Sequence, residues 1–214
     1  MKNIVLSLLL LTMITSTATS QNRVLPAPIA DGGLPVNRAL AERRSTREYN
    51  PERTLDMQTV SNLLWACCGI NRPDDAHRTN PTAMNRQEID AYYFDSTGVY
   101  LYDFAGNSLT QVAAGDRRAL LAGSGEFVQD FVLTAPSAVL LVADSSKLPA
   151  SDRAMSMAAC DAGIASENIN LFCAGNGLVT VTRATMDVDG LREALSLPDT
   201  AIPLLNNPVG YPVQ

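Results

Sequence analysis

The clearest helical pattern in the chain lies between Asp56 and Cys68. Its apolar residues stand at the spacing of one helix face: Val60, Leu63, Leu64 and Cys67. Asp56 or Thr54 is placed to cap the start of this helix, and Gly69 is placed to end it. The pattern therefore predicts a helix with one buried face.

The longest helical pattern runs from Arg153 to Gly175 and is rich in alanine, methionine and other small residues. A helix that is apolar on nearly all sides is usually buried. We therefore expect it either in the centre of the domain or across a subunit interface. Shorter helical patterns lie over 36–42, 117–121, 126–133 and 188–195.

Strand patterns fill much of the chain between these helices. Glu88–Phe94 and Val99–Phe104 are rich in aromatic and β-branched residues, and the turn sequence 95–98 between them predicts a hairpin. A short run at Leu109–Val112 is expected to extend it. Ser137–Ala143 is continuously apolar, which is typical of a central strand covered on both faces.

Two further strands are expected near the end of the chain. One covers Leu178–Thr182, and the other covers Ile202–Val213 with a break at Asn206-Asn207-Pro208. No internal repeat is visible. Helices and strands thus alternate around an inserted hairpin, which indicates an α+β or α/β class.

The N-terminal residues have the pattern of a secretory signal. Lys2 precedes the apolar run Ile4–Ile14, and small polar residues with Ala18 and Ser20 at the −3 and −1 positions follow. The run is shorter than the about 20 residues that span a bilayer. We expect residues 1–20 to be removed, with export to the periplasm; the alternative is a buried N-terminal helix.

Composition narrows the class of protein. Residues 21–35 form an irregular arm, floppy or wrapped around a partner, and 36–214 has the length of one domain. The net charge of −6 and the pI near 4.7 argue against nucleic acid as a partner. No second apolar stretch approaches membrane length, so the mature protein is expected to lack a membrane span.

Four cysteines raise the question of disulfides in an exported protein. Cys67 and Cys68 are adjacent in an apolar helical pattern. Cys160 and Cys173 are about 20 Å apart along one predicted helix, so they cannot pair within it. No spacing resembles a zinc site. We therefore expect free, buried thiols.

The sequence Arg43-Arg44-Ser45-Thr46-Arg47-Glu48-Tyr49 is strongly basic in an acidic protein. Guanidinium groups bind phosphate through paired, charge-assisted hydrogen bonds, and hydroxyls add neutral ones. The cluster favours an anion site, for which a phosphorylated small molecule is the natural ligand. The alternative is a solvated helix end whose cations stabilise the helix dipole.

A long polar segment, Asn71–Gln87, follows the first long helix. Loops of this length in a compact domain are usually functional or disordered. The small residues in its middle and the amides at its end suit a flat heterocycle. A plain surface loop is the alternative.

Familiar catalytic arrangements are missing from the sequence. His77 is the only histidine, and nothing near it in sequence marks a triad. Gly175-Asn176-Gly177 lacks the third glycine of a dinucleotide fingerprint, and no P-loop is present. The chain is therefore either not an enzyme, or its chemistry is carried by a cofactor.

Several motifs together resemble the nitroreductase superfamily of flavoproteins. The Arg43–Tyr49 segment is similar to the signature that opens that family. The motifs that resemble later family segments are 63–72, Arg78–Gln87, Gly177-Leu178-Val179-Thr180 and Val209-Gly210-Tyr211-Pro212. The resemblance spans about residues 36–212, with the motifs in the order that the family has.

The resemblance implies a three-layer α-β-α fold of the α+β class, with a mainly antiparallel sheet, in an intertwined homodimer. It implies FMN at the dimer interface, so that each site draws on both chains, and it places much of the 153–175 helix in the dimer core. The implied FMN-binding residues are Arg43, Arg44, Ser45, Arg47, Pro81, Thr82, Ala83, Asn85, Gln87, Gly177 and Leu178.

The same resemblance gives these residues different parts of the flavin to hold. Arg43, Ser45 and Arg47 would contact the phosphate, the ribityl chain or the ring edge. The Pro81–Ala83 segment would lie along the isoalloxazine, with Asn85 and Gln87 hydrogen-bonding nearby. The backbone near Gly177 would face the reactive part of the ring.

The implied function is an exported FMN-dependent oxidoreductase. It would pass hydride from NAD(P)H, or from another donor, to a nitroaromatic, a quinone or a similar acceptor by ping-pong chemistry, with no catalytic protein residue. Another donor and a dehydrogenase direction like that of the azoline-oxidising branch stay open. So does a non-catalytic protein that binds flavin or a partner.

One feature of the sequence departs from the family pattern. No Lys or Arg follows Pro212, where family members often continue into basic residues that hold the phosphate. The phosphate is therefore expected to depend on Arg43 and Arg47, with Arg78 or Arg183 as additional candidates.

Overall fold

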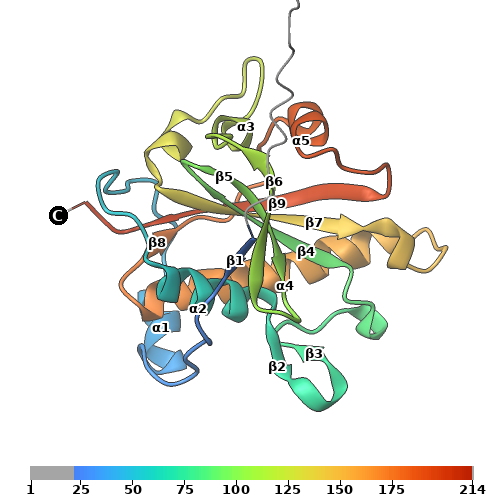
Figure 1. The fold of residues 1–214 in the computed structure, drawn as a ribbon, viewed down its shortest axis with the longest axis horizontal. Helices are drawn as coiled ribbons and strands as arrows, with labels where there is room; N and C mark the ends of the chain where they lie inside the picture. The colour runs from blue at the N-terminus through green and yellow to red at the C-terminus, as the bar shows by residue number, and fades with distance from the viewer. Residues whose placement is uncertain (1–21, 214) are drawn as a thin grey trace, which may run out of the picture.

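A seven-stranded antiparallel sheet forms the centre of the protein in the computed structural model, which describes residues 22–213 (Figure 1). Its strand order is β1-β6-β5-β4-β7-β9-β8. The strands are β1 (Asn22–Val24), β4 (Ile89–Asp95), β5 (Gly98–Asp103), β6 (Ser108–Ala114), β7 (Ser137–Asp144), β8 (Val179–Thr180) and β9 (Ala201–Gly210). A separate two-stranded sheet pairs β2 (Ile70–Arg72) with β3 (His77–Arg78).

Helices cover both faces of the sheet, so the fold has three layers (Figure 1). One face carries α1 (Val36–Glu42), α2 (Met57–Cys68) and α4 (Ala154–Gly175). The other carries α3 (Ala119–Ala122), the 3₁₀ helix η3 (Asp130–Thr134) and α5 (Val188–Ala194). Three more 3₁₀ helices lie in connections: η1 (Pro73–Asp75), η2 (Ala83–Asn85) and η4 (Ser145–Lys147). The α+β class and the three-layer α-β-α arrangement are confirmed.

The central strand β7 shows how the sequence forms the two cores. Successive side chains of a strand point to opposite faces. Val139, Leu141 and Ala143 pack in the core beneath α2 and α4. Ala138, Leu140 and Val142 pack in the core beneath α3 and α5. Because both faces are covered, the strand is apolar throughout, as its continuous run predicted.

Helix α2 forms as the sequence predicted. The Asp56 carboxylate accepts a hydrogen bond of 2.7 Å from the backbone N–H of Thr59, and this caps the first turn. All four residues of the predicted apolar face are fully buried: Val60, Leu63, Leu64 and Cys67. The predicted hairpin is also present as β4 and β5, and β6 extends it.

The arm that precedes α1 lies along its own chain. It begins with β1, which pairs with β6, where the sequence predicted no regular structure. Leu25 is buried in the core, and the Ser61 hydroxyl donates a hydrogen bond of 2.6 Å to the Pro26 carbonyl. The predicted signal at 1–20 lies outside the described residues.

Three other expectations about secondary structure were wrong in part. The 71–87 segment contains the β2–β3 pair instead of being irregular throughout. Of the predicted 126–133 helix, only η3 from Asp130 onward is helical. Strand β9 continues through Asn206-Asn207-Pro208, because its two buried amide side chains find partners inside the protein.

Helix α4 has one buried face and one exposed face, whereas the sequence predicted burial on nearly all sides. Its buried residues include Asp161 and Asn170 as well as small apolar residues. Met155, Cys160 and Ile164 are exposed on the other side. The expectation of free thiols is confirmed for all four cysteines, but Cys160 is not buried. An apolar surface on a long helix suits contact with another chain.

Candidate cofactor site

A cavity of about 520 Å³ lies where the end of α1, the C-terminal half of α4 and strand β8 meet. This volume is in the range of small-molecule sites, about 300–1,000 Å³. Its walls are formed by Ala41, Glu42, Arg43, Arg44, Thr46, Asn170, Cys173, Ala174, Gly177, Leu178, Val179, Thr180 and Pro212. Four of the predicted site residues are therefore brought together here: Arg43, Arg44, Gly177 and Leu178.

The segment after α1 is held against β8 by backbone contacts. Ser45 forms a parallel bridge with Thr180, and the Thr46 N–H donates a hydrogen bond of 3.0 Å to the Thr180 carbonyl. The buried Tyr49 hydroxyl donates to the Thr46 carbonyl at 2.9 Å. Burial raises the pKa of Tyr49, so this hydroxyl keeps its proton. The aromatic residue of the motif thus anchors the basic segment.

Close packing of Tyr49 explains a glycine of the last motif. A Cβ added at Gly210 would lie 2.6 Å from Pro136 and 3.2 Å from Tyr49. The first distance is shorter than side chains allow, so only glycine fits without movement. The first and last motifs of the sequence therefore support each other in the fold.

The cavity carries two guanidinium groups, and the acid in its wall, Glu42, forms its ion pair with Arg38 instead. The Arg43 Nε lies 4.0 Å from a Glu167 carboxylate oxygen, which is the limit of an ion pair. Asn170 also holds Glu167, through a hydrogen bond of 2.8 Å from its Nδ2. Arg44 is exposed at the cavity wall. Both arginines are therefore available to an anion.

Two further features point to a ligand in this cavity. Thr180 is buried, yet its hydroxyl has no hydrogen-bond partner within the described chain. Such a group usually finds a partner in water or a ligand. Gly177 has a φ of +69°, and a Cβ added to it would meet no atom within 4 Å. The backbone there is open to close approach.

A buried polar network supports the floor of the cavity. The Ser166 hydroxyl donates to Asn207 Oδ1 at 2.7 Å and lies 2.7 Å from the Thr182 hydroxyl. Asn207 Nδ2 in turn donates to Asn170 Oδ1 at 3.3 Å. Burial raises the pKa of Cys173, so its thiol at the wall stays protonated and is a poor nucleophile.

The other arginines that were expected near the phosphate, Arg47, Arg78 and Arg183, do not line the cavity. Arg47 is exposed outside the cavity wall, 5.9 Å from the Phe131 ring. Arg183 is buried and donates to Gln129, Asn206 and the carbonyls of Leu121 and Ala122. These bonds occupy it within the fold.

Arg78 is also occupied inside the protein. It is buried, donates a hydrogen bond of 2.7 Å to the Ile89 carbonyl, and stacks 3.4 Å from the centre of the Phe104 ring. As additional phosphate ligands, Arg78 and Arg183 are therefore both ruled out by burial.

The remaining predicted residues lie in a separate place, on the loop between β3 and β4. Pro81 is exposed, and Thr82 accepts a hydrogen bond of 2.8 Å from the Gln87 N–H. The Ala83 N–H donates to Asp161 Oδ2 at 2.7 Å. The Gln87 side chain donates to Asn85 Oδ1 at 3.1 Å, which holds the end of the loop.

The two groups of predicted residues do not meet within one chain. The loop is bound to α4 at Asp161, whereas the cavity lies on α4 at Asn170 and Cys173. Asp161 and Cys173 are about 18 Å apart along the helix axis. Figure 1 likewise shows α1 and β8 near one end of α4 and the β3–β4 connection beside the other.

Other functional classes find no support in the described residues. His77 Nδ1 lies 2.8 Å from the Asp75 carboxylate on a small hairpin, away from the cavity. Across 22–213, no three His, Cys, Asp or Glu side chains are grouped to hold a metal ion. None of the helices in this range is both long and apolar enough to cross a membrane.

Sequence reasoning missed the walls that α4 and β8 supply. Asn170, Cys173, Ala174 and Thr180 line the cavity, but no local motif marks the three α4 residues. Thr180 belongs to the Gly177-Leu178-Val179-Thr180 motif, and its hydroxyl was the available signal.

The residues present at the cavity fit FMN. Arg43 and Arg44 supply cations for a phosphate, the free Thr180 hydroxyl supplies a hydrogen-bonding group, and Gly177 leaves room for a flat ring against the backbone. The fit is incomplete in a single chain, because Pro81–Gln87 lies elsewhere.

Comparison with known proteins points to one family. The model of the nitroreductase family matches residues 40–211. A search of curated proteins gave no match. Among solved structures, a protein assigned as a nitroreductase from Ralstonia eutropha JMP134 is 31% identical, with a TM-score of 0.82 and 90% of each chain covered.

Two more distant structures share the fold. A protein assigned as a nitroreductase from Anabaena variabilis is 21% identical with a TM-score of 0.72; the match covers 91% of this chain and 42% of that one. A protein assigned as an NADH oxidase from Clostridium acetobutylicum is 23% identical with a TM-score of 0.59, covering 82% of this chain and 88% of that one.

The different roles of two arginines give a prediction about stability. Replacing Arg183 by Ala should lower the free energy of unfolding by about 3 kcal/mol, because several buried acceptors lose their donor. Replacing Arg44 by Ala should change it by less than about 0.5 kcal/mol. Urea denaturation measures both, and equal losses would contradict the assignment.

Proposed function

This chain belongs to the nitroreductase family, and we propose that it is an exported FMN-dependent oxidoreductase with two flavin sites in a homodimer. Family membership supports an oxidoreductase activity. The cofactor, the dimer, the donor and export are the parts that we add from this chain's own residues.

The observation that carries the proposal is the chemistry of the α1–α4–β8 cavity. Two guanidinium groups with only a distant counter-ion, an unpartnered buried hydroxyl and an uncovered glycine backbone are collected there. Guanidinium groups suit a phosphate, a hydroxyl suits a polyol chain, and an open backbone suits a planar ring. FMN carries all three parts.

The division of the site supports a dimer. Pro81–Gln87 is the segment expected at the flavin ring, but it is held at Asp161, which lies about 14 Å along α4 from Asn170 and about 18 Å from Cys173 of the cavity wall. A second chain packed on the exposed face of α4 would bring its own loop to the first chain's cavity. Met155, Cys160 and Ile164 supply an apolar surface for that contact.

The protein's contribution to the reaction is positioning. Bound FMN would supply the redox chemistry, accepting hydride from NAD(P)H or another donor and then reducing a nitroaromatic, a quinone or a similar acceptor in a ping-pong sequence. Arg43 and Arg44 would fix the phosphate, and the Gly177–Leu178 backbone would hold the ring against the cavity wall. No side chain at the cavity has to act as a nucleophile.

Export rests on the sequence of residues 1–20 alone, with their basic, apolar and small-residue regions in order. A periplasmic location would favour a donor other than NAD(P)H, because nicotinamide nucleotides are chiefly cytoplasmic. The same argument keeps a dehydrogenase direction open.

The proposal is tested first on the purified protein. Residues 21–214 should bind FMN and show a flavin spectrum, which NADH, NADPH or dithionite should bleach and a quinone should restore. Failure to bind added FMN would refute the cofactor. Flavin that binds but cannot be reduced and reoxidised would instead identify a non-catalytic flavin-binding protein.

A variant at Arg43 tests the phosphate site. Arg43→Ala should weaken FMN binding about tenfold to a hundredfold, because a charge-assisted hydrogen bond contributes roughly 1.5–3 kcal/mol. Riboflavin, which has no phosphate, should bind both proteins equally. Arg117→Ala removes an exposed arginine outside the cavity and is the control. Unchanged FMN affinity of the Arg43 variant would place the phosphate elsewhere.

Cys160 reports on the dimer. It is the one exposed cysteine of the chain, since Cys67, Cys68 and Cys173 are buried. In a dimer that packs on α4, a thiol reagent should label the native, fully reduced protein at least about tenfold more slowly than a monomeric Ile164→Glu variant. Rapid labelling of Cys160 in a sample of dimer mass would exclude this interface.

A further inference from the structure

Glu88 is the most unusual acidic residue of the described chain. It is fully buried just before β4. Neither of its carboxyl oxygens accepts a hydrogen bond from an N–H or hydroxyl group of the described residues. Burial of an uncompensated carboxylate is unfavourable, so such a group keeps its proton instead. Burial, more than any other cause, raises the pKa of Glu88 to about 7.

The neighbour of Glu88 is a second acid, Asp161 of α4. The two carboxyl groups lie within hydrogen-bonding range, and this contact also raises the pKa of Glu88. Two carboxyl groups can share a hydrogen bond only when one of them carries a proton. Asp161 is itself 5% exposed and uses its Oδ2 to accept the Ala83 N–H at 2.7 Å. The pair therefore connects a buried proton to the loop.

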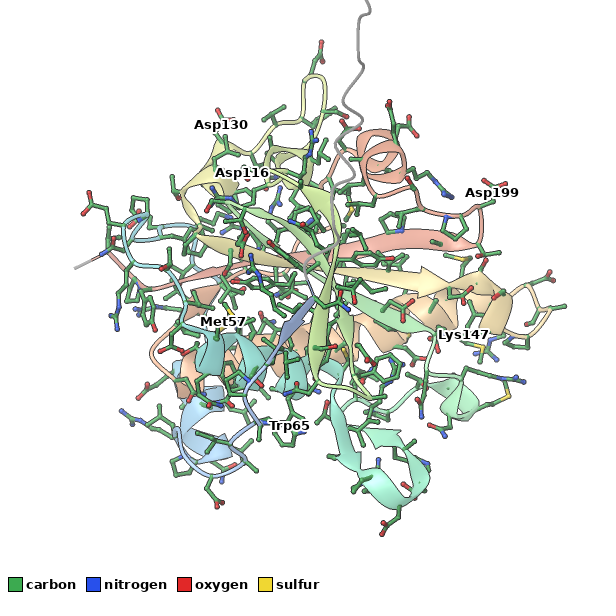
Figure 2. The ribbon with its side chains drawn as sticks, in the orientation of Figure 1. Met57, Trp65, Asp116, Asp130, Lys147 and Asp199 are labelled. Carbon is green, nitrogen blue, oxygen red and sulfur yellow. The ribbon has the colours of Figure 1, made fainter. Side chains whose placement is uncertain are left out.

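Few other charged groups face this pair. Arg78 of β3 attracts the ionised Glu88 carboxylate, and this attraction is the smallest of the effects on the Glu88 pKa. Lys147 of η4 donates to the Gln87 carbonyl at 3.4 Å and lies 4.0 Å from Asp144. Figure 2 shows Lys147 on the side of the molecule where the β3–β4 connection lies. Neither cation forms an ion pair with Glu88 or Asp161.

The loop above the pair has a conformation that needs support. Met84, Asn85 and Gln87 all have φ near +50°, a region that residues other than glycine rarely occupy. The Ala83–Asp161 hydrogen bond is the one that joins the middle of the loop to α4. Asn80, just before Pro81, is buried with neither side-chain polar atom paired, so its amide adds no support.

We propose that Glu88 and Asp161 share one proton, and that this protonated pair holds the Pro81–Ala83 segment in the conformation that receives the flavin ring. Both are positioning residues, acting through the Ala83 backbone. The inference rests on the proposed function for the identity of the ligand, but the state of the pair and of the loop does not depend on flavin.

The direction of the pH effect follows from the chemistry of an acid. The folded protein holds the Glu88 proton up to about pH 7, whereas the unfolded chain releases it near the ordinary value for glutamate. The stabilising effect is therefore complete below that ordinary value and is lost as pH rises through about 7. Above it, two negative charges face each other, and the loop is released.

The first arm of the test needs no flavin. Amide hydrogen exchange at Ala83, corrected for its intrinsic rate, is followed from about pH 5.5 to about pH 8.5. In the wild-type protein, protection should fall by up to about tenfold per pH unit as pH rises toward about 7, because the closed loop still holds the Glu88 proton that the open loop releases, and it should level off above about pH 7. In Glu88→Gln it should stay constant, because the amide can donate to Asp161 at every pH. Asp90→Asn, which removes another acid from β4, should behave like the wild type.

An infrared spectrum of the wild-type protein tests the shared proton without any variant. The wild-type protein at about pH 6 should show the band of a buried protonated carboxyl group, and this band should disappear as pH rises through about 7. A band that is absent at pH 6, or an Ala83 protection that does not change with pH, overturns the proposal.

The second arm adds FMN. Its affinity should fall above about pH 7 in wild type and Asp90→Asn, and should be independent of pH in Glu88→Gln. Affinity that changes equally in wild type and Glu88→Gln overturns the role of the pair in the flavin site. If no protein binds FMN at any pH while Ala83 protection still titrates, the proposed function fails and the proton-sharing pair stands.

Discussion

The length of α4 is the constraint on which the functional account depends. The helix has 22 residues, and the two groups of residues expected at a flavin are attached to different turns of it. Asp161 holds the loop that carries Ala83, and the later turn with Asn170 and Cys173 forms the wall beside Arg43. A rigid helix keeps them apart. One chain therefore holds two separate groups of these residues, and in the dimer that we propose each group would be completed by the other chain.

The arginines of the protein differ in whether they have partners within the fold. The chain has a net charge of −6, yet most of its arginines outside the cavity have partners in the fold. Arg183 ties β9 to α3, and Arg78 stacks on the Phe104 ring. Arg43 and Arg44 are left with no strong partner. These two arginines are therefore the guanidinium groups of the cavity wall that are free to bind an anion.

Sequence patterns predicted those parts of the fold whose signal is local. Helix α2 has both its cap and its apolar face within 13 residues, and β7 has a continuous apolar run, so both were predicted correctly. Strand β1 has only three residues and forms because β6 offers an edge, which no local pattern reports. The break predicted at Asn206–Pro208 was wrong because Arg183 and Ser166 satisfy the two amides.

The candidate site was predictable to the extent that it lies in motifs. The Arg43–Tyr49 segment and Gly177–Leu178 were identified from sequence, and the fold brings Arg43, Arg44, Gly177 and Leu178 to one cavity. The burial of Arg78 and Arg183 depends on tertiary contacts and could not be foreseen. Neither could the contact between Glu88 and Asp161, because 73 positions separate them in the chain. The separation of the Pro81–Gln87 loop from the cavity could not be predicted either, because it depends on which turns of α4 each of them contacts.

The most direct measurement is the FMN content of mixed dimers. One chain carries Arg43→Ala, which damages the phosphate half-site, and the other carries Ala83→Trp, which blocks the ring half-site. Each homodimer should bind FMN poorly. If sites are shared between chains, the mixed dimer contains one site with both changes and one intact site, so one FMN per dimer is predicted. A mixed dimer that binds no FMN tightly, as expected when each chain forms its own site, would contradict the account.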